Sequence, residues 1–125
     1  MSDTISHFQN KLEHEIDAWD LNEAVRAGVR VVIIDARSES AYFQEHITYA
    51  VNLPHRKMNA ESTQHFDRDA LLVTYCDGVG CNASTKGALK LAELGFRVNE
   101  LIGGIDWWKR DGYATERQVH QPVFA

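Results

Sequence analysis

The residue with the clearest chemical potential is Cys76, which lies between a strand pattern and a helix pattern. The apolar run Leu71 to Tyr75 leads directly into Cys76, a loop with two glycines follows, and a helical pattern begins at Ala83. A cysteine in this place presents its sulfur to loop N–H groups and to the N-terminus of the next helix. Both favour the thiolate, which is the nucleophilic form of cysteine. The pattern therefore predicts a reactive Cys76.

The loop after Cys76 is predicted to surround its sulfur. Gly78 and Gly80 allow backbone conformations that other residues resist, so the N–H groups can curl into an anion-binding nest. Asp77 adds a negative charge nearby, and we expect its carboxylate to point into solvent, where the repulsion is screened. We therefore expect the whole loop to bind substrate, and its residues are Asp77, Gly78, Val79, Gly80, Cys81 and Asn82.

The second cysteine, Cys81, leaves three interpretations open. It is a resolving thiol for Cys76, a packing residue of the loop, or a neighbour of the helix cap. In the cytoplasm, two cysteines are usually thiols rather than a structural disulfide. A zinc site would need two further ligands, and the histidines are scattered along the chain. We therefore predict neither a metal site nor a cofactor.

Composition and charge limit the class of protein. The chain has 125 residues and a net charge of −5, which indicates one domain and gives no electrostatic support for nucleic-acid binding. Its longest aliphatic run falls far short of the about 20 residues that span a bilayer. The N-terminus lacks the apolar core of a signal peptide. We expect a cytoplasmic protein with no nucleic-acid and no membrane partner.

Strand and helix patterns alternate along the chain. The predicted strands are Val31 to Ile34, Tyr49 to Leu53, Leu71 to Tyr75 and Arg97 to Ile102. The predicted helices are Asp17 to Ala27, Ser38 to Glu45, Ala60 to Phe66, Ala83 to Leu94 and Ile105 to Asp111, and the tail from Thr115 looks irregular. Alternation of this kind indicates an α/β domain with a mostly parallel sheet. Sites in such domains lie beyond the carboxyl ends of the strands, where Arg37 and Cys76 would meet.

An additional helix is predicted at the N-terminus, from about Thr4 to Glu15. Ile5, Phe8 and Leu12 recur at spacings of three and four, which places them on one face. We expect this face to pack on the domain, and the alternative is a helix that binds a partner or forms a dimer. The chain is accordingly divided into an N-terminal helical extension, residues 1–15, and a domain of residues 16–125.

Four stretches between about Ile16 and Tyr113 resemble the single-domain rhodaneses, a family of sulfurtransferases. They are Val31 to Arg37, ending in Asp-x-Arg; Tyr42 to Pro54, with His46-Ile47, Ala50 and Asn52; Tyr75-Cys76; and Gly95-Phe96 with Leu101 to Trp108, which carries Gly103-Gly104. The resemblance implies a rhodanese-like α/β fold with a central, mostly parallel five-stranded sheet flanked by helices. The N-terminal helix would be an addition to that fold.

The cysteine loop departs from the family pattern, which usually reads Cys-x-x-Gly-x-Arg-Ser. No arginine or lysine stands between Cys76 and Lys86, and the spacing to the helix looks about two residues longer. Longer loops occur in the related dual-specificity phosphatases, but these need an arginine to hold the phosphate, which argues against a phosphatase. Glu45, Thr48 and Tyr49 also replace the family's Gly, Pro and Gly at turn positions.

The resemblance implies that Cys76 takes a sulfur atom from a donor such as thiosulfate and becomes a persulfide. Cyanide or a thiol, either a small molecule or one on a protein partner, would then accept that sulfur. An anionic donor needs a cation, for which Arg37 is our candidate, with Arg56, Lys57 and Lys86 as further ones. Two alternatives are a non-catalytic rhodanese-fold binding or regulatory module and a thiol redox enzyme that uses Cys76 and Cys81.

Overall fold

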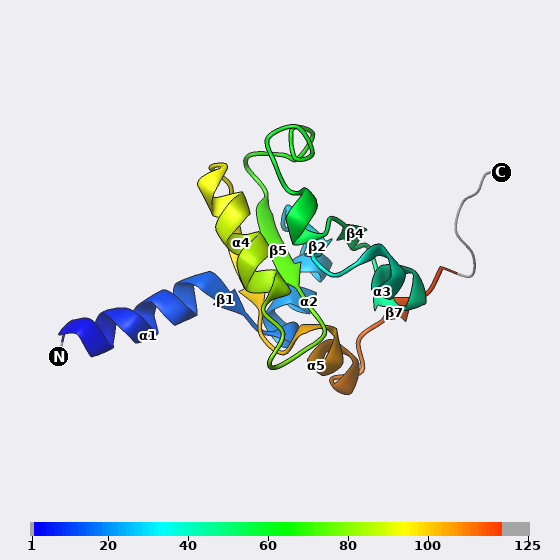
Figure 1. Ribbon diagram of the computed structural model, residues 1–125. Helices are drawn as coiled ribbons and strands as arrows, with labels where there is room; N and C mark the ends of the chain where they lie inside the picture. Colours follow the sequence, from blue (N-terminus) through cyan, green and yellow to red (C-terminus); the bar gives the residue numbers. More distant parts are fainter. Residues whose placement is uncertain (1, 119–125) are drawn as a thin grey trace.

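The protein is built around a five-stranded parallel sheet with the strand order β1-β6-β5-β2-β4 (Figure 1). The structure is a computed structural model that describes residues 2–118. The strands are β1 Glu15–Ile16, β2 Val31–Asp35, β4 Val51–Asn52, β5 Leu71–Tyr75 and β6 Arg97–Leu101. Every neighbouring pair in this sheet is parallel. The predicted five-stranded parallel sheet is confirmed.

Helices cover both faces of the sheet and connect its strands. They are α1 Ser2–His14, α2 Ala18–Arg26, α3 Glu39–Gln44, the 3-10 helix η1 His55–Lys57, α4 Ala83–Glu93 and α5 Gly104–Arg110. One core holds Leu21 of α2, Trp108 of α5 and Tyr75 of β5. The other holds Leu91 of α4 with Leu72 of β5. Alternate residues of β5 thus face opposite cores, as expected for a strand buried on both sides.

The predicted helix boundaries are confirmed where a capping residue marks them. Asp17 precedes α2 and accepts a hydrogen bond of 2.8 Å from the N–H of Asp20. Ser38 precedes α3 and accepts one from the N–H of Ala41. Gly28 follows α2 with a φ of +79°, a conformation that glycine adopts readily. Local side-chain chemistry therefore fixes these ends.

Three predictions for the shorter segments are wrong. Residues 60–66 form turns rather than a helix. Glu15, the predicted end of the N-terminal helix, belongs to β1, in which Ile16 pairs with Leu101 of β6. The tail contains β7, Thr115–Glu116, which pairs antiparallel with a strand that we did not predict, β3 His46–Ile47. A strand of two residues is too short to show an alternation of apolar and polar side chains, so it is recognised only by its pairing with another strand.

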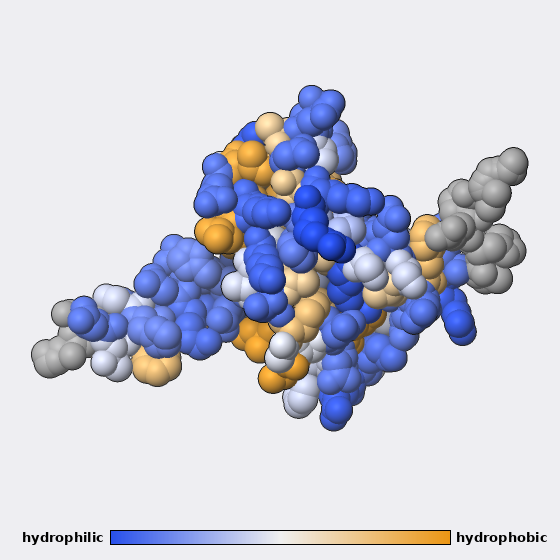
Figure 2. Space-filling view, viewed as in Figure 1, coloured by the Kyte–Doolittle hydropathy of each residue, from blue (hydrophilic) through white to orange (hydrophobic). Residues whose placement is uncertain are grey.

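Helix α1 projects away from the rest of the molecule (Figure 1). Its predicted apolar face does not pack on the domain, because Ile5, Phe8 and Leu12 are 59%, 56% and 83% exposed. The prediction that this face packs is wrong. Figure 2 shows α1 standing apart, with hydrophilic and hydrophobic surface side by side. The predicted division after residue 15 falls within β1, which ties the end of α1 to the sheet.

No helix within residues 2–118 combines the length and the apolar character needed to cross a membrane.

Candidate functional site

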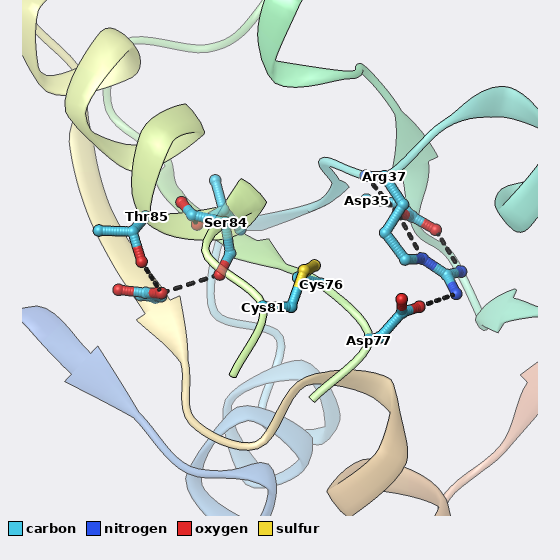
Figure 3. The surroundings of a disulfide bond; sticks show 9 residues. Asp35, Arg37, Cys76, Asp77, Cys81, Ser84 and Thr85 are labelled. Carbon is cyan, nitrogen blue, oxygen red and sulfur yellow. Dashed lines mark hydrogen bonds and ion pairs between the residues drawn. A yellow bond between two sulfur atoms is a disulfide. The ribbon is translucent and has the colours of Figure 1, made fainter. Parts of the chain in front are cut away.

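The candidate site lies at the carboxyl ends of two neighbouring strands. Asp35, the last residue of β2, is in register with Tyr75, the last residue of β5. The next residues along the chain, Ala36-Arg37 and Cys76-Asp77, therefore emerge side by side (Figure 3). Parallel strands bring these segments together although about forty residues separate them in the sequence.

Cys76 and Cys81 form a disulfide across the loop, with their Cα atoms 6.2 Å apart (Figure 3). The prediction that both are thiols is wrong for this structure. The physical reason is a turn in which the N–H of Cys81 donates to the carbonyl of Gly78 at 3.2 Å and Gly80 has a φ of +95°. This turn folds the chain back on itself, and it brings the second sulfur onto the first.

The two sulfurs differ in their surroundings. Cys76 is only 3% exposed, whereas Cys81 is half-buried. Cys76 directly follows the central strand β5, and the turn carries Cys81 outward. A molecule from solvent therefore reaches Cys81 more easily than Cys76.

The base of the loop is attached to the start of α5. The carbonyls of Cys76 and Asp77 accept hydrogen bonds from the N–H groups of Ile105 at 3.0 Å and Asp106 at 2.9 Å. Gly104, with a φ of +59°, lies so close that a Cβ atom there would overlap the Cys76 carbonyl. The Gly103-Gly104 turn identified in the sequence is therefore what allows the loop and α5 to meet.

The upper part of the loop has free backbone donors. Within the described residues, the N–H groups of Gly78, Val79 and Gly80 donate to no protein oxygen. Helix α4 begins directly after the loop, and Asn82 before it makes no side-chain cap. Unsatisfied N–H groups and a helix N-terminus both favour a bound anion. The loop can therefore bind an anion.

Glu100 is a site residue that the sequence analysis missed. Its Oε2 accepts hydrogen bonds from the hydroxyls of Ser84 at 2.8 Å and Thr85 at 2.6 Å, both in the first turn of α4. The carboxylate therefore places a negative charge beside the helix N-terminus that serves the loop. Nothing in the local sequence of β6 distinguishes Glu100 from a surface residue, because the contact depends on strand pairing.

A pocket of about 530 Å³ lies beside the disulfide and is open to solvent. Its lining includes both cysteines, the loop residues Gly78, Val79 and Gly80, Glu100, and the Gly103-Gly104 turn. Two residues from the end of the N-terminal helix region, Lys11 and Glu15, line it as well. Lys11 is the one lysine or arginine among these lining residues. It also forms an ion pair of 3.0 Å with Glu15.

Arg37, our candidate for the substrate-binding cation, is held by protein groups instead. Its guanidinium donates to both carboxylate oxygens of Asp35, at 2.9 and 2.7 Å, and to the carbonyl of Glu45. It also donates to the carboxylate of Asp77 at 3.1 Å, as Figure 3 shows. Arg37 is absent from the lining of the cysteine pocket. The contact with Asp77 nevertheless links it to the loop.

The charged groups around Arg37 form a closed network, in which each is paired with another protein group. Burial works to lower the pKa of Arg37, but its hydrogen bonds and charge interactions with Asp35 and Asp77 raise it above the usual value. Burial, followed by the charge of Asp35, raises the pKa of Tyr75. The hydroxyl of Tyr75 donates to Asp35 at 2.8 Å. Asp77 is 73% exposed, so its carboxylate does face solvent while it pairs with Arg37.

The other predicted cations lie outside the pocket. Lys57 pairs with Glu39 at 3.3 Å. Lys86 and Arg56 do not line the pocket, but their charges reach His55. Burial first, then the charges of Lys86, Lys90 and Arg56, lower the pKa of His55.

One set of possible metal ligands is found in the described part of the chain, namely Cys76, Asp77 and Cys81, whose ligand atoms lie within 4.8 Å of one another. The disulfide occupies both sulfurs, and a structural zinc site would need a fourth ligand. The set therefore does not fit a structural zinc ion.

Comparison with known proteins identifies the family to which this geometry is similar. The family model described as a rhodanese-like domain matches residues 17–111. The thiosulfate sulfurtransferase GlpE of Coxiella burnetii is 33% identical over 96 residues, which cover 75% of this chain and 82% of that protein.

Solved structures agree with this match. The BH2092 protein of Bacillus halodurans has a TM-score of 0.87 and 34% identity, covering 99% of this chain and 93% of that chain. A thiosulfate sulfurtransferase from Pseudomonas aeruginosa has a TM-score of 0.75 and 29% identity over 85% of this chain, but only 20% of that chain. The similarity to the Bacillus protein covers nearly the whole chain.

Proposed function

The chain belongs to the rhodanese-like domain family, and we propose that it moves a sulfane sulfur from a donor such as thiosulfate to a thiophilic acceptor through a persulfide on Cys76. The observation that carries the proposal is the position of Cys76. It directly follows a central strand, lines an open pocket, and is followed by loop N–H groups that donate to no protein oxygen. The similarity to GlpE, whose name is thiosulfate sulfurtransferase, supports thiosulfate as the first donor to test.

Reduction of the disulfide is the first step in this proposal. While Cys76 is bonded to Cys81 it cannot form the thiolate that attacks a donor, so a dithiol must first convert both residues to thiols. The reductant becomes a disulfide in the same exchange. The protein therefore needs a reducing agent before its first turnover. The cytoplasm, the location predicted from the sequence, is a reducing compartment, and that location stays a prediction.

The reduced Cys76 then acts as a nucleophile. Its thiolate attacks the outer sulfur of thiosulfate, the sulfur–sulfur bond of the donor breaks, and sulfite leaves with the bonding electrons. The product is the Cys76 persulfide. The N–H groups of Gly78, Val79 and Gly80 stabilise negative charge on the sulfur, as an oxyanion hole does for oxygen. An acceptor thiolate or cyanide next attacks the outer sulfur and releases the Cys76 thiolate.

Lys11 supplies the cation that draws an anionic donor toward the pocket. The family pattern places an arginine in the loop, and this chain has none there. Arg37 is engaged by Asp35, Glu45 and Asp77, whereas Lys11 lines the pocket and has an exposed fraction of 49%. Glu15 and Glu100 oppose its charge. We therefore expect weak attraction for thiosulfate and a high KM.

The proposal is tested by steady-state turnover of the reduced protein. With thiosulfate and cyanide, the wild-type chain should release both sulfite and thiocyanate. Cys76→Ser should release neither, whereas Cys81→Ser, the matched control, should still release both. Equal thiocyanate from wild type and Cys76→Ser would overturn the proposal.

The two alternatives give different results in the same assay. A rhodanese-fold binding or regulatory module would form no product with thiosulfate or with other sulfane-sulfur donors. A thiol redox enzyme would lose all turnover in Cys81→Ser, including transfer to cyanide. The acceptor in the cell can be a small thiol, cyanide or a thiol on a protein partner, and the assay with cyanide does not depend on that choice.

A further inference from the structure

We propose that Cys81 discharges the Cys76 persulfide as sulfide, so that with a dithiol reductant the protein reduces sulfane sulfur in addition to transferring it. This inference rests on the proposed function, because it needs the persulfide as its starting point. It assigns Cys81 a chemical role and adds a second reaction, the release of hydrogen sulfide. The two cysteine thiols then supply the electrons that reduce the sulfane sulfur.

The geometry supports a direct reaction between the two residues. The disulfide shows that Cys81 reaches the sulfur of Cys76 within this fold, with the strands and α4 in place. The Cα–Cα distance of 6.2 Å lies within the range of ordinary disulfides. Both residues belong to one loop, and the turn from Gly78 to Cys81 holds the second thiol near the first. Such proximity gives an internal thiol a large effective concentration over a thiol in solution.

The reaction balances without an outside oxidant. The Cys81 thiolate attacks the inner sulfur of Cys76–S–SH, a new bond forms between the two cysteine sulfurs, and the bond to the outer sulfur breaks. The outer sulfur leaves as HS⁻ with its proton and the electron pair. The two cysteines are thereby oxidised to the disulfide, and the sulfane sulfur is reduced to sulfide by two electrons.

The product of this step is the disulfide present in the structure. A dithiol reductant regenerates the two thiols by exchange, and burial decides where it attacks. Cys76 is 3% exposed and Cys81 half-buried, so the reductant attacks the sulfur of Cys81. Cys76 is then the leaving thiolate, and the loop N–H groups stabilise it. The buried nucleophile and the more accessible resolving thiol thus have separate tasks.

A single-turnover experiment tests this inference. Wild type and Cys81→Ser are fully reduced, freed of reductant, and mixed with one equivalent of thiosulfate without any acceptor. Released sulfite, released sulfide and the intact mass of each protein are then measured. The wild type should release about one sulfide per chain on the same molar scale as its sulfite, and its mass should fall by two hydrogens relative to the reduced protein.

The Cys81→Ser variant should release sulfite but no sulfide. It should keep one added sulfur atom on Cys76, which cyanide removes as thiocyanate. Cys81→Ala is measured alongside, so that the result does not depend on the serine hydroxyl. A wild type that retains the added sulfur and releases no sulfide, as both variants do, would overturn the inference while leaving the proposed function intact. Absence of sulfite and of any adduct from all three proteins would overturn both.

Discussion

Two neighbouring strand ends at one edge of the sheet have opposite characters. At the end of β2, Asp35 and Arg37 form a buried ion pair in which the side chains are 0% and 10% exposed. At the end of β5, Cys76 opens onto a pocket through a loop whose middle residue, Val79, is 92% exposed. The register between Asp35 and Tyr75 makes these two regions direct neighbours.

The difference lies in how completely the polar groups are satisfied. Asp35 accepts hydrogen bonds from Arg37 and Tyr75, and no buried side-chain nitrogen or oxygen in the described residues lacks a partner. The loop N–H groups of Gly78, Val79 and Gly80 donate to no protein oxygen. A closed network positions its neighbours, whereas an open set of donors can bind. The charges of Asp35 and Arg37 are therefore structural, whereas the loop backbone provides groups that can bind an anion.

The largest effect is expected from breaking the closed network at Asp35. Asp35→Ala leaves the Arg37 guanidinium buried without its main partner, which should lower the free energy of unfolding by about 3–5 kcal/mol. Asp77→Ala is the matched control, because it removes the exposed carboxylate of the same arginine and should cost about 1 kcal/mol or less. Denaturant unfolding of both variants measures the difference. Equal losses would contradict the division between a buried and an exposed partner.

A smaller loss of stability is expected at the turn that supports the loop. Gly104→Ala introduces a Cβ atom that overlaps the Cys76 carbonyl, and its φ of +59° disfavours alanine. Gly112→Ala is a matched control, because its φ of +87° is similar but no atom lies within 4 Å of the added Cβ. The control should lose about 1 kcal/mol from backbone strain, and Gly104→Ala about 1–3 kcal/mol more together with most turnover. Indistinguishable variants would show that the loop does not depend on this contact.

Tyr75→Phe tests the network through pH. The Tyr75 hydroxyl donates to Asp35 and accepts from the N–H of Ile47 at 3.0 Å, so its loss should cost about 1–3 kcal/mol at neutral pH. The fold raises the pKa of Tyr75, chiefly through burial and then through Asp35. The stability from the neutral hydroxyl is therefore complete below the unfolded pKa of about 10 and is lost as pH rises above it.

The measurement is the free energy of unfolding of both proteins between neutral pH and about pH 11, just above the tyrosine pKa. The wild type should lose stability more steeply than Tyr75→Phe above about pH 10, and the two curves should approach each other. Parallel curves across that range would contradict a buried, neutral Tyr75.

In the open region, Glu100→Gln should make the reduced Cys76 more reactive. It removes a negative charge beside the N-terminus of α4 while retaining a side-chain oxygen for Ser84 and Thr85. We expect the reduced Cys76 thiol to be alkylated faster at neutral pH, since nearby like charge disfavours a thiolate. The rate of alkylation in the Cys81→Ser background measures this effect. Slower alkylation of Glu100→Gln would contradict the proposed electrostatics of the loop.

The smallest effect is expected for Lys11. Lys11→Ala should raise the KM for thiosulfate by about two- to fivefold with little change in kcat, because a partly exposed charge contributes about 1 kcal/mol or less. Lys57→Ala is the control, since Lys57 is similarly exposed but lies outside the pocket. Equal KM values for the two variants would remove Lys11 from donor binding.

The sequence predicted the parts of the site that local chemistry determines. The apolar run before Cys76, the glycines after it, and the capping residues of α2 and α3 each carry their own signal. The Gly103-Gly104 turn was identified too, although its reason, the approach to Cys76, depends on packing. The predicted five-stranded sheet followed from the alternation of patterns and from the family resemblance.

Contacts between distant segments could not be predicted in the same way. The pairing of Arg37 with Asp77 and the contact of Glu100 with α4 depend on strand order, which no local pattern encodes. The disulfide was missed because two thiols were expected from the usual state of cysteines in the cytoplasm. In this loop, however, the turn brings the two sulfurs together. The loop that lacks the family's arginine carries an additional sulfur, that of Cys81.

The central claim is that Cys76 carries the transferred sulfur, and the mass of the reduced Cys81→Ser protein after exposure to thiosulfate tests it most directly. The account predicts one added sulfur atom, located on the peptide that contains Cys76 and removed by cyanide. A protein that gains no sulfur from thiosulfate or from a persulfide donor would contradict the account.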